Sequence, residues 1–285
     1  MPPSLSLAYS TCPNDTFIFH AMTHGLVDCC GLSYSTTLED VETLNLNAIE
    51  QRYDITKLSF AALGFLQNSY GLLRTGAALG RGCGPLIVAR SGATINQMRS
   101  ALIAIPGEHT TANLLLGLFL KDQLNFKTPL VTAMTFDQIM PAICERQVDF
   151  GVIIHEGRFT YQNYDLVSIA DLGQWWEQKT ALPIPLGAIA IRRDLPEHVK
   201  KTVENTIGAS VRFAFNHKDA AGDYIKQYAA EMSETVIEQH IELYVNSFSS
   251  DLGEEGSRAV NRLFKMARQA DLLPDSNAPL WACKA

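Results

Sequence analysis

The chain passes repeatedly from short apolar runs to longer amphipathic segments. Residues 4–9 alternate between polar and apolar positions as a β-strand does, and Asn14 to His24 follows as a short helix. Farther along, residues 85–89 and 186–191 form continuous apolar runs, which are typical of strands that are buried on both faces. This alternation of strand and helix favours an α/β protein with largely parallel sheets.

The middle third of the chain shows the alternation most clearly. It predicts strands over residues 101–105, 130–135 and 150–154 and helices over 111–124 and 137–146. Such a βαβαβ order forms a parallel sheet with helices on both faces and right-handed connections. The first third repeats the pattern, with strands predicted over 32–36 and 55–58 and helices over 41–51 and 59–68.

Three helices are predicted after the second apolar run. Asp194 is expected to cap the first of them, in which an apolar residue recurs at every fourth position, namely Val199, Val203, Ile207 and Val211. The other two, over 235–245 and 254–270, have no strands of their own to cover. The simplest arrangement therefore returns these helices to the sheet of the first block.

Two lobes with a cleft between them follow from this arrangement. Residues 1–88 and 192–285 are expected to form the first lobe and residues 89–191 the second, so that two crossovers join them. The layout resembles the type II periplasmic-binding-protein fold, an α/β fold with a central cleft. A single doubly wound domain is the competing topology.

Composition and charge narrow the class of protein. Of the 285 residues, 47% are hydrophobic and 19% are charged, which is the composition of a folded globular protein rather than a disordered or fibrous one. The formal net charge is −7 and no basic run stands out, so neither a nucleic acid nor a membrane surface is an expected partner. A small-molecule partner fits this composition better.

Cysteine spacing and the N-terminal segment bear on the cell compartment. The six cysteines include no CxxC pair, which argues against a zinc knuckle or a disulfide framework. The N-terminal segment lacks a basic stretch followed by an apolar one, and no run approaches the roughly 20 apolar residues of a membrane span. We therefore expect a reduced, cytoplasmic protein.

Polar residues that directly follow the predicted strands are the candidates for chemistry, because ligands bind beyond the carboxyl ends of parallel strands. After the first strand, Asn14 or Asp15 can cap the next helix while free backbone N–H groups face the cleft, although a cap with no further function is an equally good interpretation. Lys57 and Ser59 share one side of the extended segment at 55–58 and suit a carboxylate or a polyol. A lysine that is only solvated is the more common case.

Two further strand ends carry candidate groups. Thr110 and Thr111 start a predicted helix, where hydroxyls and free N–H groups can hold an anion, although an ordinary Thr N-cap explains them equally well. His155 follows four apolar residues and is either a base in the cleft or a histidine bonded to backbone at the edge of the core. Glu156 is expected to point to the opposite side of an extended chain, so it is not an obvious partner for the ring of His155.

Other candidates are weaker. His20 and His24 are spaced as metal ligands can be, but no third ligand is evident, so no metal site is expected. Cys12 lies near the expected cleft without the signature of a cysteine hydrolase. Trp175 and Trp176 form either a lid or interface patch or, more commonly for tryptophan, part of the buried packing.

Three segments carry a resemblance to a known family. They are Ser10 to Ala21 (STCPNDTFIFHA), Asp54 to Ser59 (DITKLS) and Gly151 to Glu156 (GVIIHE). With these segments the chain resembles the 1,4-dihydroxy-6-naphthoate synthases of the futalosine route to menaquinone, and the resemblance extends over essentially the whole chain.

The resemblance implies a binding-protein fold that has become an enzyme. It implies a carbon–carbon lyase that converts cyclic dehypoxanthine futalosine to 1,4-dihydroxy-6-naphthoate and dihydroxyacetone, with no metal and no organic cofactor. It also implies that His155 accepts a proton. The expected substrate contacts are Lys57, Leu58, Ser59, Thr110 and Thr111, matched by motif, and Asn14, added from the strand-end argument.

Two other functions remain open. Chorismate dehydratase of the same pathway shares the two-lobe fold and removes water from chorismate. A non-catalytic binding protein of this fold closes on a small molecule without chemistry, and His155 would then have no reaction to serve.

Overall fold

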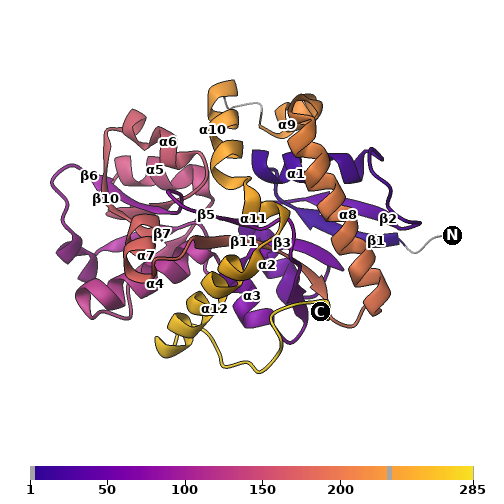
Figure 1. Cartoon of the computed structure of the whole chain (residues 1–285). Helices are drawn as coiled ribbons and strands as arrows, with labels where there is room; N and C mark the ends of the chain where they lie inside the picture. Colours follow the sequence, from indigo (N-terminus) through magenta and orange to yellow (C-terminus); the bar gives the residue numbers. More distant parts are fainter. Residues whose placement is uncertain (1–3, 230–232, 285) are drawn as a thin grey trace.

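The computed structural model describes residues 4–229 and 233–284 and contains two β-sheets that lie side by side (Figure 1). In the larger sheet the strand order is β2-β1-β3-β11-β4, and β5 pairs with β11. Its strands are β1 (Ser4–Tyr9), β2 (Ser33–Leu38), β3 (Ile55–Ser59), β4 (Tyr70–Leu72), β5 (Ala78–Gly80) and β11 (Ile184–Arg192). The strands β1, β2 and β3 are parallel, whereas β11 runs antiparallel to β3.

The smaller sheet has the strand order β10-β6-β9-β7-β8. Its strands are β6 (Leu86–Arg90), β7 (Leu102–Ile105), β8 (Leu130–Ala133), β9 (Phe150–Ile153) and β10 (Leu166–Asp171). The strands β7, β8 and β9 are parallel, and β6 runs antiparallel to both of its neighbours. We call the part built on the larger sheet the first lobe and the part built on the smaller sheet the second lobe.

The helices divide between the lobes. Those of the first lobe are α1 (Pro13–Thr23), α2 (Val41–Ile49), α3 (Phe60–Leu66), α8 (Glu197–Asn216) and α9 (Gly222–Tyr228). Those of the second lobe are α4 (Thr111–Leu124), α5 (Phe136–Cys144), α6 (Gly157–Thr160) and α7 (Leu172–Thr180). The chain closes with α10 (Glu234–Tyr244), α11 (Ser247–Ser250) and α12 (Gly253–Gln269).

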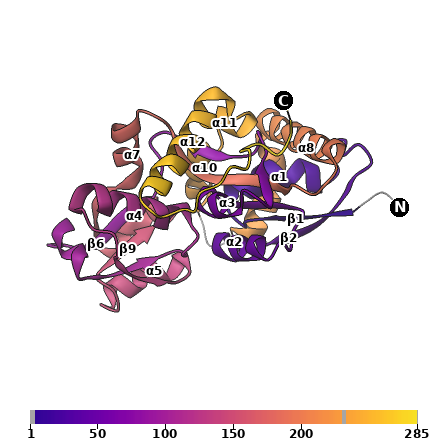
Figure 2. The ribbon, with the colours of Figure 1, turned by 90° about the horizontal axis from the view of Figure 1, so that it is seen from below.

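The closing helices lie along the junction of the two lobes. Figure 1 shows α10 above this junction and α12 below it. Figure 2 shows the two lobes from below. The helix α10 packs against α1, whereas α12 contacts β11 and α3 of the first lobe and α4 of the second. The C-terminal segment therefore returns to the first lobe, as expected, and also touches the second.

The long helices follow their sequence patterns closely. The helix predicted over 111–124 is confirmed as α4 with the same ends. In α8 the apolar stripe is buried, with Val203, Ile207 and Val211 wholly enclosed against α1 and β11. Burial of each such side chain contributes roughly 1.5–3 kcal/mol, which is why an amphipathic repeat predicts a helix so well.

The two apolar runs are confirmed as β6 and β11, and they belong to different sheets. The strand β6 lies wholly in the smaller sheet, and β11 returns the chain to the larger one. The sheets therefore do not divide at the predicted boundaries 88/89 and 191/192: residues 86–88 of β6 belong to the smaller sheet, and residues 184–191 of β11 belong to the larger one.

One expected helix cap is wrong. The residue that caps α8 is Pro196, which makes no side-chain bond to the helix, and not Asp194. The carboxylate of Asp194 instead accepts a hydrogen bond of 3.0 Å from the Nε of Arg192. An arginine two residues away supplies a charged donor, which the helix N–H groups do not.

The strand order brings four strand ends to the space between the lobes. Parallel pairing puts the carboxyl ends of β1 and β3 at one edge of the larger sheet, and those of β7 and β9 at one edge of the smaller sheet. The last residues of β3 and residues that follow β1, β7 and β9 line one common cavity. Among residues 4–229 and 233–284, none of the helices has the length and apolar character that a membrane crossing requires.

Candidate active site

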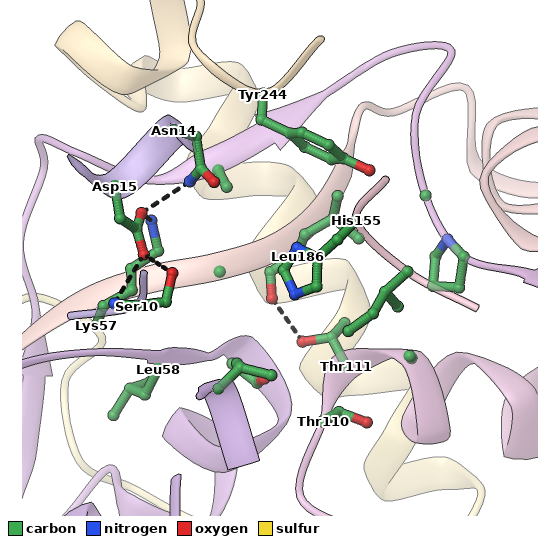
Figure 3. A pocket seen from close by; sticks show the side chains of 18 residues that line it. Ser10, Asn14, Asp15, Lys57, Leu58, Thr110, Thr111, His155, Leu186 and Tyr244 are labelled. Atoms are coloured by element: carbon green, nitrogen blue, oxygen red, sulfur yellow. Dashed lines mark hydrogen bonds and ion pairs between the residues drawn. The ribbon is translucent and has the colours of Figure 1, made fainter. Parts of the chain in front are cut away.

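The cavity between the lobes has a volume of about 690 Å³, counted with its opening to solvent (Figure 3). Its walls are largely apolar, from residues such as Val41, Leu58, Ala78, Pro85, Ile154 and Leu186. All the substrate contacts expected from the sequence line it, as does His155; they are Asn14, Lys57, Leu58, Ser59, Thr110 and Thr111. The structure brings these residues together, and their roles in a reaction stay predictions.

On the first-lobe side, Lys57 and Asp15 form a buried ion pair. The Nζ of Lys57 lies 2.6 Å from Oδ1 of Asp15 and 3.3 Å from the carbonyl oxygen of Gly76. Asp15 also accepts hydrogen bonds from Asn14 Nδ2 at 2.7 Å and from Ser10 Oγ at 2.6 Å, and Figure 3 shows these side chains as one connected group. The ammonium group of Lys57 is therefore not the free cation that the sequence suggested.

The start of α1 differs from the expectation. Its N-cap is Cys12, which makes no side-chain bond to the helix, and Asn14 and Asp15 lie within the first turn. Neither residue caps the helix as predicted, because Pro13 takes the first helical position and the N-cap therefore falls at Cys12, two residues before Asn14. The first turn instead presents the Asn14 amide and the Asp15 carboxylate to the cavity.

Ser59 is held in place by a buried asparagine. Its backbone N–H donates to Oδ1 of Asn45 at 2.9 Å, and its hydroxyl accepts from Nδ2 of the same residue at 3.2 Å. Asn45 is completely buried on α2. The hydroxyl proton of Ser59 thus remains available to a ligand in the cavity.

On the second-lobe side, Thr110 caps α4 as an ordinary N-cap. Its hydroxyl accepts from the N–H of Asn113 at 3.2 Å and donates to the carbonyl of Gly107 at 2.7 Å. The hydroxyl of Thr111 donates to the carbonyl of Leu186 at 2.7 Å. Both hydroxyl protons are therefore used within the protein.

The backbone amides of α4 are the donors that remain at this end of the cavity. First-turn N–H groups have no acceptor within their own helix, and Thr111 and Ala112 both line the cavity. Such amides, together with the positive end of the helix dipole, favour an anionic group.

His155 lies in a strained backbone conformation two residues after the end of β9. Its φ angle is +54°, in the left-handed region, which costs a non-glycine residue about 1–2 kcal/mol. The ring projects into the cavity beside Leu186 (Figure 3), and Phe136 packs against it edge-on, with 5.2 Å between ring centroids.

The first lobe supplies a thiol to this ring. The Sγ of Cys12 lies 3.5 Å from Nδ1 and 3.8 Å from Nε2 of His155. Burial raises the pKa of the Cys12 thiol to about 12, so at neutral pH it is a weak hydrogen-bond donor and not a thiolate nucleophile. Burial also lowers the pKa of His155 below its ordinary value of 6.5, so its ring is neutral and can accept a proton.

Two residues of α10 complete the surroundings of His155, and the strand-end argument did not identify them. Tyr244 lines the cavity, and the ring of His240 stacks on that of His155 with 5.9 Å between centroids. Burial, with a smaller contribution from His155, holds the pKa of His240 well below 6.5, so this ring stays neutral. Their spacing of four places both on one face of a helix, and this was the only local signal.

The structure also decides the expectations for Glu156 and for the two tryptophans. Glu156 does not continue an extended strand: it is helical, with φ −64° and ψ −21°, because the chain turns at His155. Trp175 and Trp176 are buried on α7, and the indole N–H of Trp176 donates to the carbonyl of Pro183, so they are packing rather than a lid. In the described ranges, no three His, Cys, Asp or Glu side chains are arranged to hold a metal ion.

Comparisons with known proteins agree with this architecture. The menaquinone biosynthesis family matches residues 5–269. A 1,4-dihydroxy-6-naphthoate synthase from Thermus thermophilus is 45% identical, over 98% of this chain and 99% of its own length. A crystal structure of a protein from Archaeoglobus fulgidus is similar with a TM-score of 0.87 and 35% identity, over 95% of this chain and 98% of that one.

The fold class rests on a more distant likeness as well. A Candida albicans protein with the generic periplasmic-binding-protein fold is similar with a TM-score of 0.70 at 14% identity, over 96% of this chain and 92% of that one. The predicted two-lobed α/β fold is thereby confirmed.

Proposed function

The chain belongs to the menaquinone biosynthesis family, and we propose that it is the enzyme that forms 1,4-dihydroxy-6-naphthoate. We further propose that it is a carbon–carbon lyase whose substrate is cyclic dehypoxanthine futalosine and whose second product is dihydroxyacetone. The cytoplasmic location expected from the sequence stays a prediction.

The observation that carries this proposal is the placement of His155. A neutral imidazole stands at the end of a rigid strand, in a strained conformation, in a cavity whose walls are apolar enough for an aromatic ring. Formation of the aromatic product requires removal of a proton and cleavage of a carbon–carbon bond. An imidazole that is neutral at pH 7 suits the proton removal.

The two ends of the cavity suit the two ends of such a substrate. The carboxylate is proposed to lie at the N-terminus of α4, against the N–H groups of Thr111 and Ala112. The hydroxyl-bearing end is proposed to lie near Asn14 and Ser59, which offer an amide and a free hydroxyl. His155 lines the same cavity, and its apolar walls between the lobes are proposed to exclude water from the reacting bond.

Incubation with cyclic dehypoxanthine futalosine tests the proposal directly. We expect the naphthoate chromophore and dihydroxyacetone to form in equal amounts without added metal or cofactor. Chorismate is the comparison substrate, because its dehydration would identify the alternative enzyme of the same pathway. Tight binding of the futalosine with no turnover would instead favour a non-catalytic binding protein.

The position of the carboxylate gives a second prediction. Removal of the carboxylate from the product, as in 1,4-dihydroxynaphthalene, is expected to weaken binding about 10- to 100-fold, because a charge-assisted hydrogen bond is worth roughly 1.5–3 kcal/mol. Anaerobic titration calorimetry with both compounds measures the ratio of their dissociation constants.

The same titration with a Lys57→Met variant separates the two candidate donors. The ratio should persist in this variant if the amides of α4 hold the carboxylate, since Lys57 already pairs with Asp15. If the two compounds bind Lys57→Met with similar dissociation constants, the carboxylate contacts Lys57 and not the amides of α4. If they bind the wild-type protein with equal affinity, the cavity has no anion site.

A further inference from the structure

Glu42 of α2 reaches from the first lobe to the loop that precedes α4 in the second. Its Oε1 accepts a hydrogen bond of 2.9 Å from the backbone N–H of His109 and lies 3.1 Å from Nδ1 of the same residue. The Glu42 side chain is 16% exposed and that of His109 is 27% exposed, so the contact is largely shielded from water. It spans the cleft at the rim of the cavity, between Val41 and Thr110.

The loop has a recess for this carboxylate. Gly107 has a φ angle of +154°, and a Cβ atom added there would lie 2.4 Å from Cδ and 2.6 Å from Oε2 of Glu42. Any side chain at this position would therefore displace the carboxylate. Thr110, which caps α4, donates its hydroxyl proton to the carbonyl of Gly107, so the recess and the start of the helix form one unit.

The other carboxylate oxygen leads to the opposite half of the cavity. Oε2 of Glu42 accepts a hydrogen bond of 2.9 Å from Nδ2 of Asn45, and Asn45 holds both the backbone and the hydroxyl of Ser59. One carboxylate thus connects the start of α4, where the substrate anion is proposed to bind, with the serine at the end of β3. Neither Glu42 nor Asn45 lines the cavity itself.

We propose that Glu42 is a positioning residue that holds the two halves of the substrate site in their closed arrangement before substrate binds. We call the contacts of Glu42 with His109 and Asn45 the bridge. The proposed role rests on the proposed function only for the identity of the ligand, since the bridge is seen in the structure whatever the ligand is. When a site is formed in only a fraction of the free molecules, the apparent dissociation constant rises by the inverse of that fraction. Loss of the bridge should therefore act on binding and hardly at all on the chemical step.

The first test needs no ligand. Hydrogen exchange of the free protein should be faster at the His109 amide in Glu42→Ala than in the wild type, because that amide loses its acceptor. A matched control is Glu108→Gln, which removes the same charge from an exposed position in the same loop. Unchanged exchange at His109 in Glu42→Ala would show that the bridge does not form in solution.

The second test is kinetic. Glu42→Ala is expected to raise KM and the product Kd about tenfold while kcat falls less than threefold. Removal of a negative charge near an anionic ligand would by itself lower KM and the product Kd. Glu108→Gln measures this charge effect alone. Glu42→Gln keeps the shape and one of the two hydrogen bonds, so an intermediate KM is expected and misfolding is avoided.

A combination with Asn45→Ala tests the connection to Ser59. The effect of Glu42→Ala on KM should shrink to less than about threefold in the Asn45→Ala background, because the route through Asn45 is already broken. Full additivity, or a wild-type KM in Glu42→Ala, overturns the positioning role. Absence of naphthoate formation by the wild-type protein overturns the proposed function instead, and the exchange experiment then still decides whether the bridge exists.

Discussion

Replacement of His155 by asparagine is expected to lower kcat by about 10²–10⁴, the usual contribution of a positioned general base. Asparagine retains hydrogen-bonding capacity and tolerates the left-handed conformation at φ +54°, so the backbone at this position should survive the change. What is lost is the ability to take up a proton at neutral pH. The product should bind nearly as well as before, because its proposed anion site lies on α4.

Stopped assays of naphthoate formation, with calorimetric titration of the product, measure both quantities. His198→Asn is the matched control, since His198 is exposed on α8 and is not among the residues that line the cavity. A variant that keeps more than about a tenth of the wild-type kcat would make His155 a binding residue, and the search for the base would move to other groups in the cavity.

The pH dependence of the wild-type enzyme follows from the same residue. Burial lowers the pKa of His155 below 6.5, so the active neutral form prevails at pH 7 and above. Acid protonates the ring, and kcat/KM should therefore fall only as the pH drops below 6.5. The acid limb should be absent from the residual activity of His155→Asn.

Replacement of Asp15 by asparagine is expected to lower the free energy of unfolding by about 3–5 kcal/mol, the usual cost of breaking a buried ion pair by removing one partner. Lys57 is 5% exposed, and in Asp15→Asn its ammonium group keeps only neutral acceptors, namely the new amide oxygen and the Gly76 carbonyl. The reverse change, Lys57→Met, should cost less, because Asp15 keeps its donors from Ser10 and Asn14.

A double variant separates charge from shape. Asp15→Asn combined with Lys57→Met removes both charges and should recover at least about 2 kcal/mol of the stability lost in Asp15→Asn. Urea unfolding measures the free energy of unfolding of the wild type, the two single variants and the double variant. A loss below about 1 kcal/mol in Asp15→Asn would show that Lys57 is solvated, as the simplest interpretation of the sequence had it.

Activity should not recover with stability. The double variant lacks the connected polar group of Ser10, Asp15 and Lys57 that forms one wall of the cavity, so we expect KM to rise about tenfold or more relative to the wild type. A stable double variant with an unchanged KM would limit this ion pair to a structural role.

Local patterns in the sequence determined those helices and strands that bury a continuous stripe or run of apolar side chains. The four-residue repeat of α8 and the apolar runs of β6 and β11 each encode a backbone period, and burial stabilises that period directly. The strands β4 and β5 have three residues each, too few to show any period, and were not predicted. The rule that ligands lie beyond the carboxyl ends of strands placed Lys57, Thr110 and His155 around one cavity without knowledge of the strand order.

Only the tertiary structure decided how those residues are used. Lys57 pairs with Asp15, His155 contacts Cys12 and His240, and Glu42 reaches His109. The two members of each pair are between 42 and 143 residues apart in the chain. No local period records such contacts, because they depend on how two sheets and a returning C-terminal segment come together. The sequence by itself therefore determined which side chains at strand ends reach the cleft, whereas the packing of the lobes and of α10 decided which charges are neutralised, which ring is positioned and which donors remain free.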